Sequence, residues 1–98
     1  MSMDRLIREE GRLIILRGLE EQSDGRLNSE LLRQVLESYG ITKSRDWVHD
    51  ELNFLKEMGA IGVIVAGTVR VATLTAKGSD HVHRRIVIEG VKRPSREA

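Results

Sequence analysis

The sequence predicts a small α+β domain that is mostly helical, and three observations predict it. Apolar residues recur at helical spacing in several segments, a valine-rich run between Ile61 and Leu74 follows a period of two, and glycines stand where these segments should end. With 98 residues, of which only three are aromatic, we expect one domain whose core is built from Leu, Ile and Val.

The first helix is predicted from Asp4 to about Gln22. Its apolar residues are spread over more than one side, and two glycines seven residues apart share a face. A glycine inside a helix costs about 1 kcal/mol relative to alanine, so these positions indicate close approach of another backbone, either the same helix of a second subunit or later helices of this domain. We expect a homodimer whose interface contains Ile7, Gly11, Ile14, Ile15 and Gly18.

A turn and a one- or two-residue strand at Leu27 are predicted to precede a second helix. Asn28 or Ser29 should cap this helix, and it should end near Ser38, because Gly40 follows as a natural C-terminal stop. Only a few residues separate it from the next helix, which makes the pair a helix-turn-helix.

The third helix is predicted to start at a hydroxyl cap, either Thr42 or Ser44, and to stop at Gly59, which suits a left-handed C-terminal cap. Trp47, the single tryptophan, is expected to cover the edge of the core, with an interface anchor as the alternative. Apolar side chains at helical spacing form one inward stripe, which consists of Val48, Leu52, Leu55 and Met58.

A β-hairpin with its turn at Ala66-Gly67 is predicted after the third helix. A fourth helix should follow, capped by Thr75 and extending to about Arg85. A helix, a glycine stop, a hairpin and a capped helix are the order of a winged helix-turn-helix. We therefore predict a single domain, residues 1–98, with three to four helices, a two-stranded wing and a short basic tail at about residues 87–98.

Charge is divided unevenly along the chain, although the net charge is only +1. Residues 42–58 include three basic and four acidic side chains, whereas residues 77–98 include six basic and three acidic ones. The positive excess therefore lies at the C-terminus and not on the helix that a DNA-binding winged helix places in the major groove. Within this end, residues 86–88 are too apolar for a free tail and should pack on the first helix or on a partner, and only residues 95–98 are expected to be disordered.

Two marks carry a resemblance to MarR-like and ArsR-like winged-helix domains. They are the helix end Met58-Gly59-Ala60-Ile61 and the wing end Leu74-Thr75-Ala76-Lys77-Gly78. Over nearly its whole length the chain also resembles small winged-helix proteins encoded in Mu-like prophages, through Val48-His49-Asp50-Glu51-Leu52, the same wing end and Gly90-Val91-Lys92-Arg93-Pro94-Ser95. This resemblance implies a phage protein that is called a transcriptional regulator because of its fold and whose gene lies among packaging and morphogenesis genes.

Two classes of function are left open by these observations. The first is a dimeric protein that binds duplex DNA, regulatory or packaging-related, with much of the phosphate attraction supplied by the C-terminal residues. Its predicted contacts are Lys43, Arg45, His49, Asn53, Lys56, Arg70, Arg84, Arg85, Lys92 and Arg93. The second is a winged-helix module that binds another phage protein and little or no DNA. The acidic residues Asp46, Asp50 and Glu57 favour this second class, because they would repel phosphates.

Catalysis, metal binding and membrane insertion are disfavoured. The chain has no cysteine, which excludes thiolate metal sites and cysteine nucleophiles, and it has neither a glycine-rich phosphate loop nor a nucleophile beside a base. Asp80 and His83 share a helical face, but zinc needs at least one more ligand, so we expect no metal or other cofactor. No apolar run reaches a membrane-spanning length and no signal peptide precedes the first helix, so we expect a cytoplasmic protein of a bacterial host.

Overall fold

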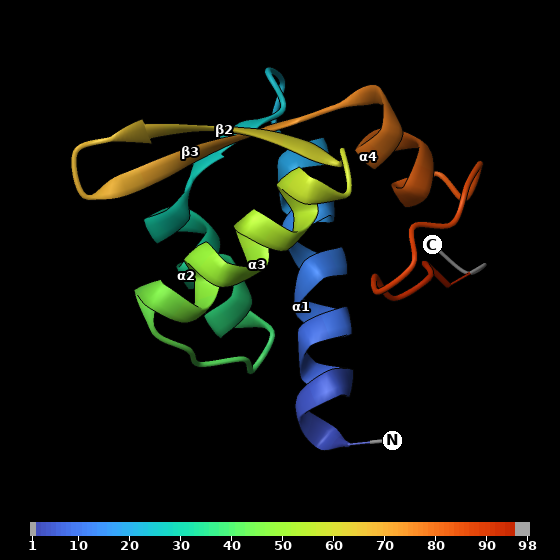
Figure 1. The fold of residues 1–98 in the computed structure, drawn as a ribbon, viewed down its shortest axis with the longest axis horizontal. Coiled ribbons are helices and arrows are strands. Elements are labelled where there is room, and N and C mark those ends of the chain that lie inside the picture. Colours follow the sequence, from blue (N-terminus) through green and yellow to red (C-terminus); the bar gives the residue numbers. More distant parts are fainter. Residues whose placement is uncertain (1, 96–98) are drawn as a thin grey trace.

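The structure, a computed structural model, describes residues 2–95, which form four helices and three strands (Figure 1). In chain order these are α1 (Met3–Glu20), β1 (Arg26–Asn28), α2 (Ser29–Ser38), α3 (Arg45–Glu57), β2 (Ile61–Ala66), β3 (Val69–Leu74) and α4 (Ala76–Val82). The helix pair α2–α3 is followed by a β2–β3 wing. The predicted winged helix-turn-helix fold is therefore confirmed.

The three strands form one antiparallel sheet in the order β1-β3-β2. Figure 1 shows this sheet along the top of the molecule, with α1, α2 and α3 beneath it and the hairpin projecting past them. The short strand predicted at Leu27 is confirmed, since Leu27 lies opposite Ala72. The predicted hairpin turn is wrong by one residue: Ala66 is still paired with Val69, so the turn consists of Gly67, at a φ of +62°, and Thr68.

Three side chains cap the helices as predicted. Asn28 accepts a hydrogen bond from the Leu31 N–H at 2.8 Å, Ser44 accepts one from Trp47, and Thr75 accepts one from Gly78. The Thr75 hydroxyl also donates to the carbonyl oxygen of Gly59 at 2.7 Å, which ties the end of α3 to the end of the wing.

Two glycines explain the sequence marks at the ends of α3 and of the wing. Gly59 has a φ of +77°, the left-handed conformation that the stop requires. Gly78 is needed for space, because a Cβ there would lie 2.3 Å from the carbonyl oxygen of Ala60. The backbones of α4 and of the α3–β2 connection therefore touch, and only glycine permits this contact.

The core lies between the sheet and the helices. The inward stripe predicted for α3 is confirmed, with Val48, Leu52 and Leu55 fully buried and Met58 packed against them. Trp47 is partly buried against the same core, as predicted for a residue at its edge.

The two glycines of α1 make room for the domain's own helices. A Cβ on Gly11 would lie 3.0 Å from the Trp47 ring of α3, and one on Gly18 would lie 3.7 Å from Leu32 of α2. The strip expected to form a subunit interface is therefore not an exposed surface. Only the first of its residues keeps intermediate exposure and the other four are buried inside the chain: Ile7, Gly11, Ile14, Ile15 and Gly18.

The fourth helix ends earlier than predicted. It stops at Val82 instead of about Arg85, and Arg84 takes a left-handed φ of +63°, which turns the chain back toward α1. The apolar run 86–88 was expected to pack on the first helix or on a partner, and within the chain this is confirmed only for Ile88, which is buried in the core together with Val91. Ile86 and Val87 are 37% and 60% exposed, so they do not pack against the rest of the chain as expected. Residues 96–98 of the segment expected to be disordered lie outside the described part of the chain.

His81 holds this returning segment in place. It is fully buried, its Nδ1 accepts a hydrogen bond from the Ile88 N–H at 3.0 Å, and its Nε2 lies 2.9 Å from the carbonyl oxygen of Lys92. Because Nδ1 accepts, the ring proton must lie on Nε2, where it is donated to Lys92. The neutral ring thus forms hydrogen bonds with two backbone groups of the C-terminal segment and holds this segment against α4.

Candidate nucleic-acid interface

The outer side of α3 has two parallel stripes of polar side chains. Residues four apart on a helix lie above one another, so Arg45, His49, Asn53 and Lys56 form one row, which we name the wing-side stripe. Its position is fixed by contacts to the wing: the Arg70 guanidinium donates to Asn53 Oδ1 at 3.2 Å. The neighbouring row, which we name the acidic stripe, is exposed and consists of Asp46, Asp50 and Glu57.

A buried hydroxyl connects the wing-side stripe to the wing. Ser29, at the start of α2, is 1% exposed; its Oγ accepts the Arg70 backbone N–H at 3.0 Å and lies 3.0 Å from His49 Nε2. Among residues 2–95 the Ser29 hydroxyl has no hydrogen-bond acceptor other than His49, so we assign His49 Nε2 as the acceptor and place the ring proton on Nδ1. The sequence indicated Ser29 only as a helix cap, because its partners are twenty and forty-one positions away.

His49 is therefore neutral at pH 7. Burial lowers its pKa below the ordinary value of 6.5, and the nearby charges of Arg70 and Arg45 lower it further. A neutral ring with the proton on Nδ1 offers one hydrogen-bond donor without a charge. Such a donor can contact a phosphate or a base edge but adds nothing to long-range attraction.

Glu51, one of the four acidic residues between positions 42 and 58, points into the molecule. It is 1% exposed. The Arg12 Nε donates to one of its carboxylate oxygens at 2.6 Å, and the Arg8 guanidinium pairs with the other. A signal for this was present, since Glu51 falls on the inward side of the helix, three positions after Val48 and four before Leu55.

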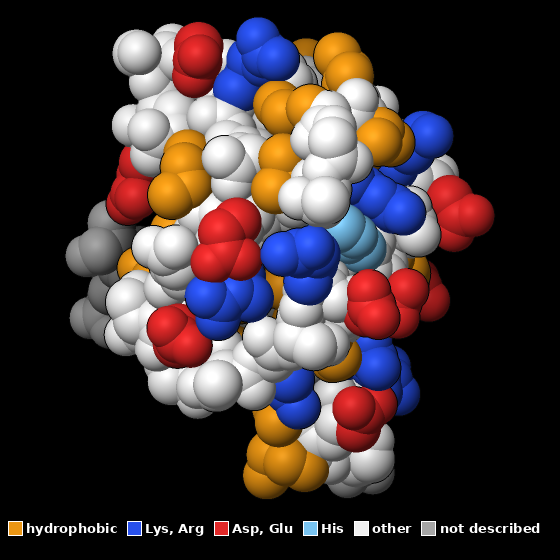
Figure 2. All heavy atoms as spheres, turned by 90° about the vertical axis from the view of Figure 1, so that its left-hand side faces the viewer, with side chains coloured by type: hydrophobic (Ala, Val, Ile, Leu, Met, Phe, Trp, Pro, Cys, Tyr) orange, Lys and Arg blue, Asp and Glu red, His pale blue; other side chains and the backbone are white. Residues whose placement is uncertain are grey.

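The burial of Glu51 changes the charge that α3 presents to a ligand. Without it, residues 42–58 have three basic and three acidic side chains, and Arg70 of the wing adds a fourth positive charge. Figure 2 shows the side of the molecule to which the wing points, where Lys and Arg are interspersed with Asp and Glu. The outer face is thus mixed and weakly basic, and not acidic as the sequence count implied.

Lys43 lies apart from the wing-side stripe. Its ammonium group sits 5.7 Å from the centre of the Trp47 ring, and the Arg8 guanidinium lies 5.5 Å from the same ring. Trp47 is thus contacted by two cations from different parts of the chain.

The C-terminal basic residues are not brought to this face. In Figure 1 the segment after α4 lies on the right, on the opposite side of the molecule from the wing tip. Two of its four predicted DNA contacts already have partners, since Arg85 pairs with Asp80 at 3.1 Å and Lys92 pairs with Glu10 at 2.9 Å. The other two, Arg84 and Arg93, border a shallow hollow beside Ile86, Val87 and Pro94.

The residues considered for a metal site are engaged in other contacts. Asp80 pairs with Arg85, and His83 Nε2 lies 2.5 Å from a carboxylate oxygen of Glu20. In the described part of the chain, no three His, Asp or Glu side chains are grouped so that they could hold a metal ion. Over residues 2–95, no helix is both long enough and apolar enough to cross a bilayer.

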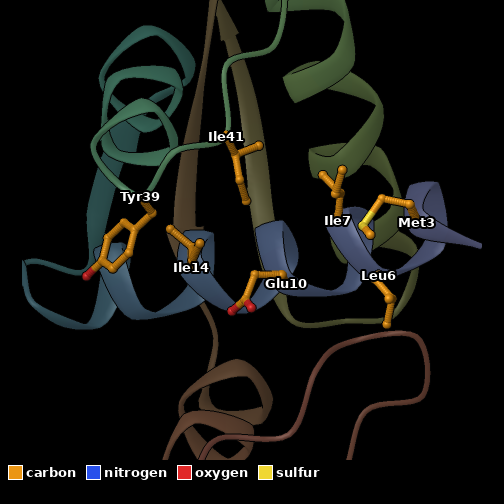
Figure 3. Close-up of a pocket in the computed structure, with 7 residues that line it drawn as sticks. All are labelled: Met3, Leu6, Ile7, Glu10, Ile14, Tyr39 and Ile41. Carbon is orange, nitrogen blue, oxygen red and sulfur yellow. The ribbon is translucent and has the colours of Figure 1, made fainter.

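A second surface feature is an open hollow of about 390 Å³ along α1, between Met3 and Ile14 (Figure 3). Five of its side chains come from α1 and two from the segment after α2. Apart from one carboxylate they are apolar or aromatic: Met3, Leu6, Ile7, Glu10, Ile14, Tyr39 and Ile41. The carboxylate, Glu10, is held by Lys92.

Comparison with known proteins gives one sequence relative and two similar structures. No family model matches the chain. Protein gp26 of Escherichia phage Mu is 35% identical over 89 residues, which cover 91% of this chain and 92% of gp26. The complex structures of hsRosR-S4 and hsRosR-S1 each superpose with a TM-score of 0.64 over 76% of this chain, at 21% identity.

These matches differ in what they show. The superposed part spans 64% of the hsRosR-S4 chain and 65% of the hsRosR-S1 chain, so this chain covers less than two thirds of their length. At 21% identity the likeness shows the winged-helix fold alone. The narrower resemblance to MarR-like and ArsR-like domains stays a prediction.

Proposed function

The chain belongs to the family of protein gp26 of Escherichia phage Mu, and on that premise we propose that it is a phage- or prophage-encoded protein that binds duplex DNA. In this proposal it has no enzymatic activity and acts as a dimer in the cytoplasm of a bacterial host, in regulation or in packaging. The observation that carries the proposal is the inward position of Glu51, which leaves the basic residues of α3 and the wing as the excess charge on the outer face.

The wing-side stripe is the part of α3 that suits DNA best. Arg45 and Lys56 offer charged donors, Asn53 offers an amide, and Arg70 adds a guanidinium from the wing. These groups are the ones that contact phosphates and base edges. The acidic stripe runs beside them, so the duplex should lie toward the wing and away from Asp46 and Asp50.

Salt dependence of binding tests this proposal directly. Each phosphate contact that is lost should flatten the plot of log affinity against log salt by about 0.9. Arg45→Ala and Arg70→Ala should each reduce the slope by about that amount. Arg84→Ala is the matched control, since it removes the same charge on the opposite side of the molecule and should leave the slope unchanged.

Two results would contradict the proposal. The first is an absence of measurable binding to mixed duplex DNA at low salt, where attraction is strongest. The second is a slope that responds to Arg84→Ala and not to Arg45→Ala, which would place the duplex at the C-terminal segment, as the charge count along the sequence implied.

A winged-helix module that binds another phage protein is the second candidate, and the wing favours it. Ile64 and Val65 are 61% and 69% exposed, and Arg70 is the single charged residue between Ile61 and Leu74. A wing that grips phosphates usually has several basic residues, whereas exposed apolar residues are typical of a protein contact.

A further inference from the structure

The strand β2 is a free edge of the sheet. It pairs with β3 on one side, and the strand order places nothing on its other side. The Thr75 N–H donates to the Ala60 carbonyl at 3.1 Å, so the next pair, Ile61 and Leu74, is a non-hydrogen-bonded pair, and Gly62 is the first residue of β2 to bond β3. Main-chain groups alternate in direction along a strand. The N–H and C=O groups of Ile61, Val63 and Val65 therefore point away from β3.

These outward groups have no main-chain partner within residues 2–95. Proteins normally shield such an edge with charged side chains, proline, a bulge or a very short strand. The strand β2 has none of these: its six residues are uncharged, contain no proline and pair with β3 in continuous register. Such an edge is a template for pairing with another strand.

The side chains of β2 are complementary to those of a second β2. In an antiparallel pair with a two-fold axis at Val63, Ile61 faces Val65 of the second copy, and Gly62 faces Ile64 of the second copy. Ile64 is 61% exposed, whereas a Cβ on Gly62 would have nothing within 4 Å. Each isoleucine would thus cover the open space above the glycine of the other copy, and this happens twice by symmetry.

We propose that two copies of the chain associate through the free edges of their β2 strands and form one six-stranded antiparallel sheet. Because β2 has no charged residue, its partner strand needs no complementary charge, and a second β2 meets this condition. The register about Val63 also covers Ile64 and Val65, the two large apolar side chains of the wing that are exposed. The contact closes after two copies, because each copy has one β2 edge. This inference rests on the dimer of the proposed function and specifies its interface, but it does not depend on DNA binding.

Sedimentation of the full chain without DNA tests the interface. We expect a dimer whose dissociation constant rises at least about tenfold, or 1.4 kcal/mol, in Gly62→Val and in Ile64→Lys. Gly62→Val is the sharper variant. It fills space that is empty in a single copy and does not require a left-handed backbone, so the thermal midpoint of the monomer should be unchanged. Val87→Lys is the control, because Val87 is equally exposed, at 60%, on the C-terminal segment.

Amide hydrogen exchange gives a second, residue-specific readout. The N–H groups of Val63 and Val65 should exchange quickly at low protein concentration and slowly at high concentration. The N–H of Ile64 already bonds β3 and should be protected at both.

Three results would overturn the proposal. They are a chain that stays monomeric at the highest concentration, a dimer that Gly62→Val leaves intact, and association that continues beyond two copies. A dimer that survives Gly62→Val but dissociates in Leu6→Lys would place the contact at the α1 hollow instead. Loss of DNA binding with the β2 dimer intact would contradict the proposed function alone.

Discussion

The two sides of α3 both have charged residues, but they use charge in opposite ways. On the inner side, Glu51 is buried and bonded to two guanidiniums of α1. On the outer side, Arg45, Asp46 and Lys56 are exposed, and no ion pair within residues 2–95 involves them. The charge that α3 presents to a ligand therefore cannot be counted along its sequence, because a charge satisfied inside the domain is unavailable to a ligand.

The inner cluster also joins three parts of the chain. Arg12 stacks 3.7 Å from the centre of the Phe54 ring, and its Nη1 donates to the carbonyl oxygen of Gly90 at 2.8 Å. The helices α1 and α3 and the C-terminal segment therefore meet at one ion pair. The outer cluster of Ser29, His49 and Arg70 joins α2, α3 and the wing through neutral hydrogen bonds, which should contribute less.

The largest effect is expected from removing the inner carboxylate. Glu51→Gln leaves two guanidiniums beside a buried neutral group, and breaking a buried ion pair in this way should lower the free energy of unfolding by about 3 kcal/mol. Urea unfolding followed by circular dichroism measures it. Glu57→Gln, at an exposed position of the same helix, should stay within about 0.5 kcal/mol of the wild type. Equal losses in the two variants would erase the distinction between the two sides.

A pair of glycine variants tests the contact between the inner cluster and the C-terminal segment. Gly90 and Gly40 have nearly equal φ values of +88° and +85°, so alanine should cost each about 1 kcal/mol in backbone strain. A Cβ on Gly90 would also lie 2.5 Å from the Phe54 ring, whereas one on Gly40 would have nothing within 4 Å. We expect Gly90→Ala to lose at least about 1 kcal/mol more than Gly40→Ala in thermal or urea unfolding. An equal loss in the two variants would show that Phe54 and the C-terminal segment can move apart to accept the added methyl group at no cost in stability.

The outer cluster should give a smaller effect. Ser29→Ala removes the acceptor of the Arg70 N–H and the donor to His49, and a lost buried hydrogen bond costs about 1 kcal/mol. Ser38→Ala is a suitable control, since the Ser38 hydroxyl bonds a carbonyl of its own helix at an exposed position. If Ser29→Ala were as costly as Glu51→Gln, the outer cluster would also be a main support of the fold.

The smallest effect is a change with pH. The pKa of His49 is lowered in the folded protein, so the unfolded chain binds a proton near pH 6.5 before the folded one does. Stability should therefore fall as the pH drops below about 6.5 toward the lower folded value. His49→Gln keeps a hydrogen-bonding group and should fall less steeply between pH 7.5 and 5.5. Parallel stability curves for the two proteins would contradict a role for His49 in this range.

The parts of the fold that depend on neighbours in sequence were predictable. The caps at Asn28 and Thr75, the glycine stop at Gly59 and the inward stripe of α3 are set by residues within a few positions of each other. A one- or two-residue strand at Leu27 against the hairpin was also predicted, and the observed strand has three residues, Arg26–Asn28.

The misplaced features depend on contacts between distant residues. Glu51 is buried because of Arg8 and Arg12, about forty positions earlier, and helical spacing alone does not reveal an acidic residue's partner. The fourth helix ends early because His81 binds the backbone of the returning segment. The environment of Gly11 also depends on a distant residue, since its neighbour is Trp47 of α3. The sequence pattern of a glycine strip is the same whether the strip faces another helix of the chain or another subunit.

The position of Trp47 also gives the protein a built-in optical probe. It is the only tryptophan of the chain, so its fluorescence arises from a single known place, where the ring lies against Gly11 and is flanked by the cations of Arg8 and Lys43. Ultraviolet emission should therefore report separation of α3 from α1 during unfolding without any added label. A ligand that draws the Lys43 ammonium group away from the ring should shift the emission while the protein stays folded.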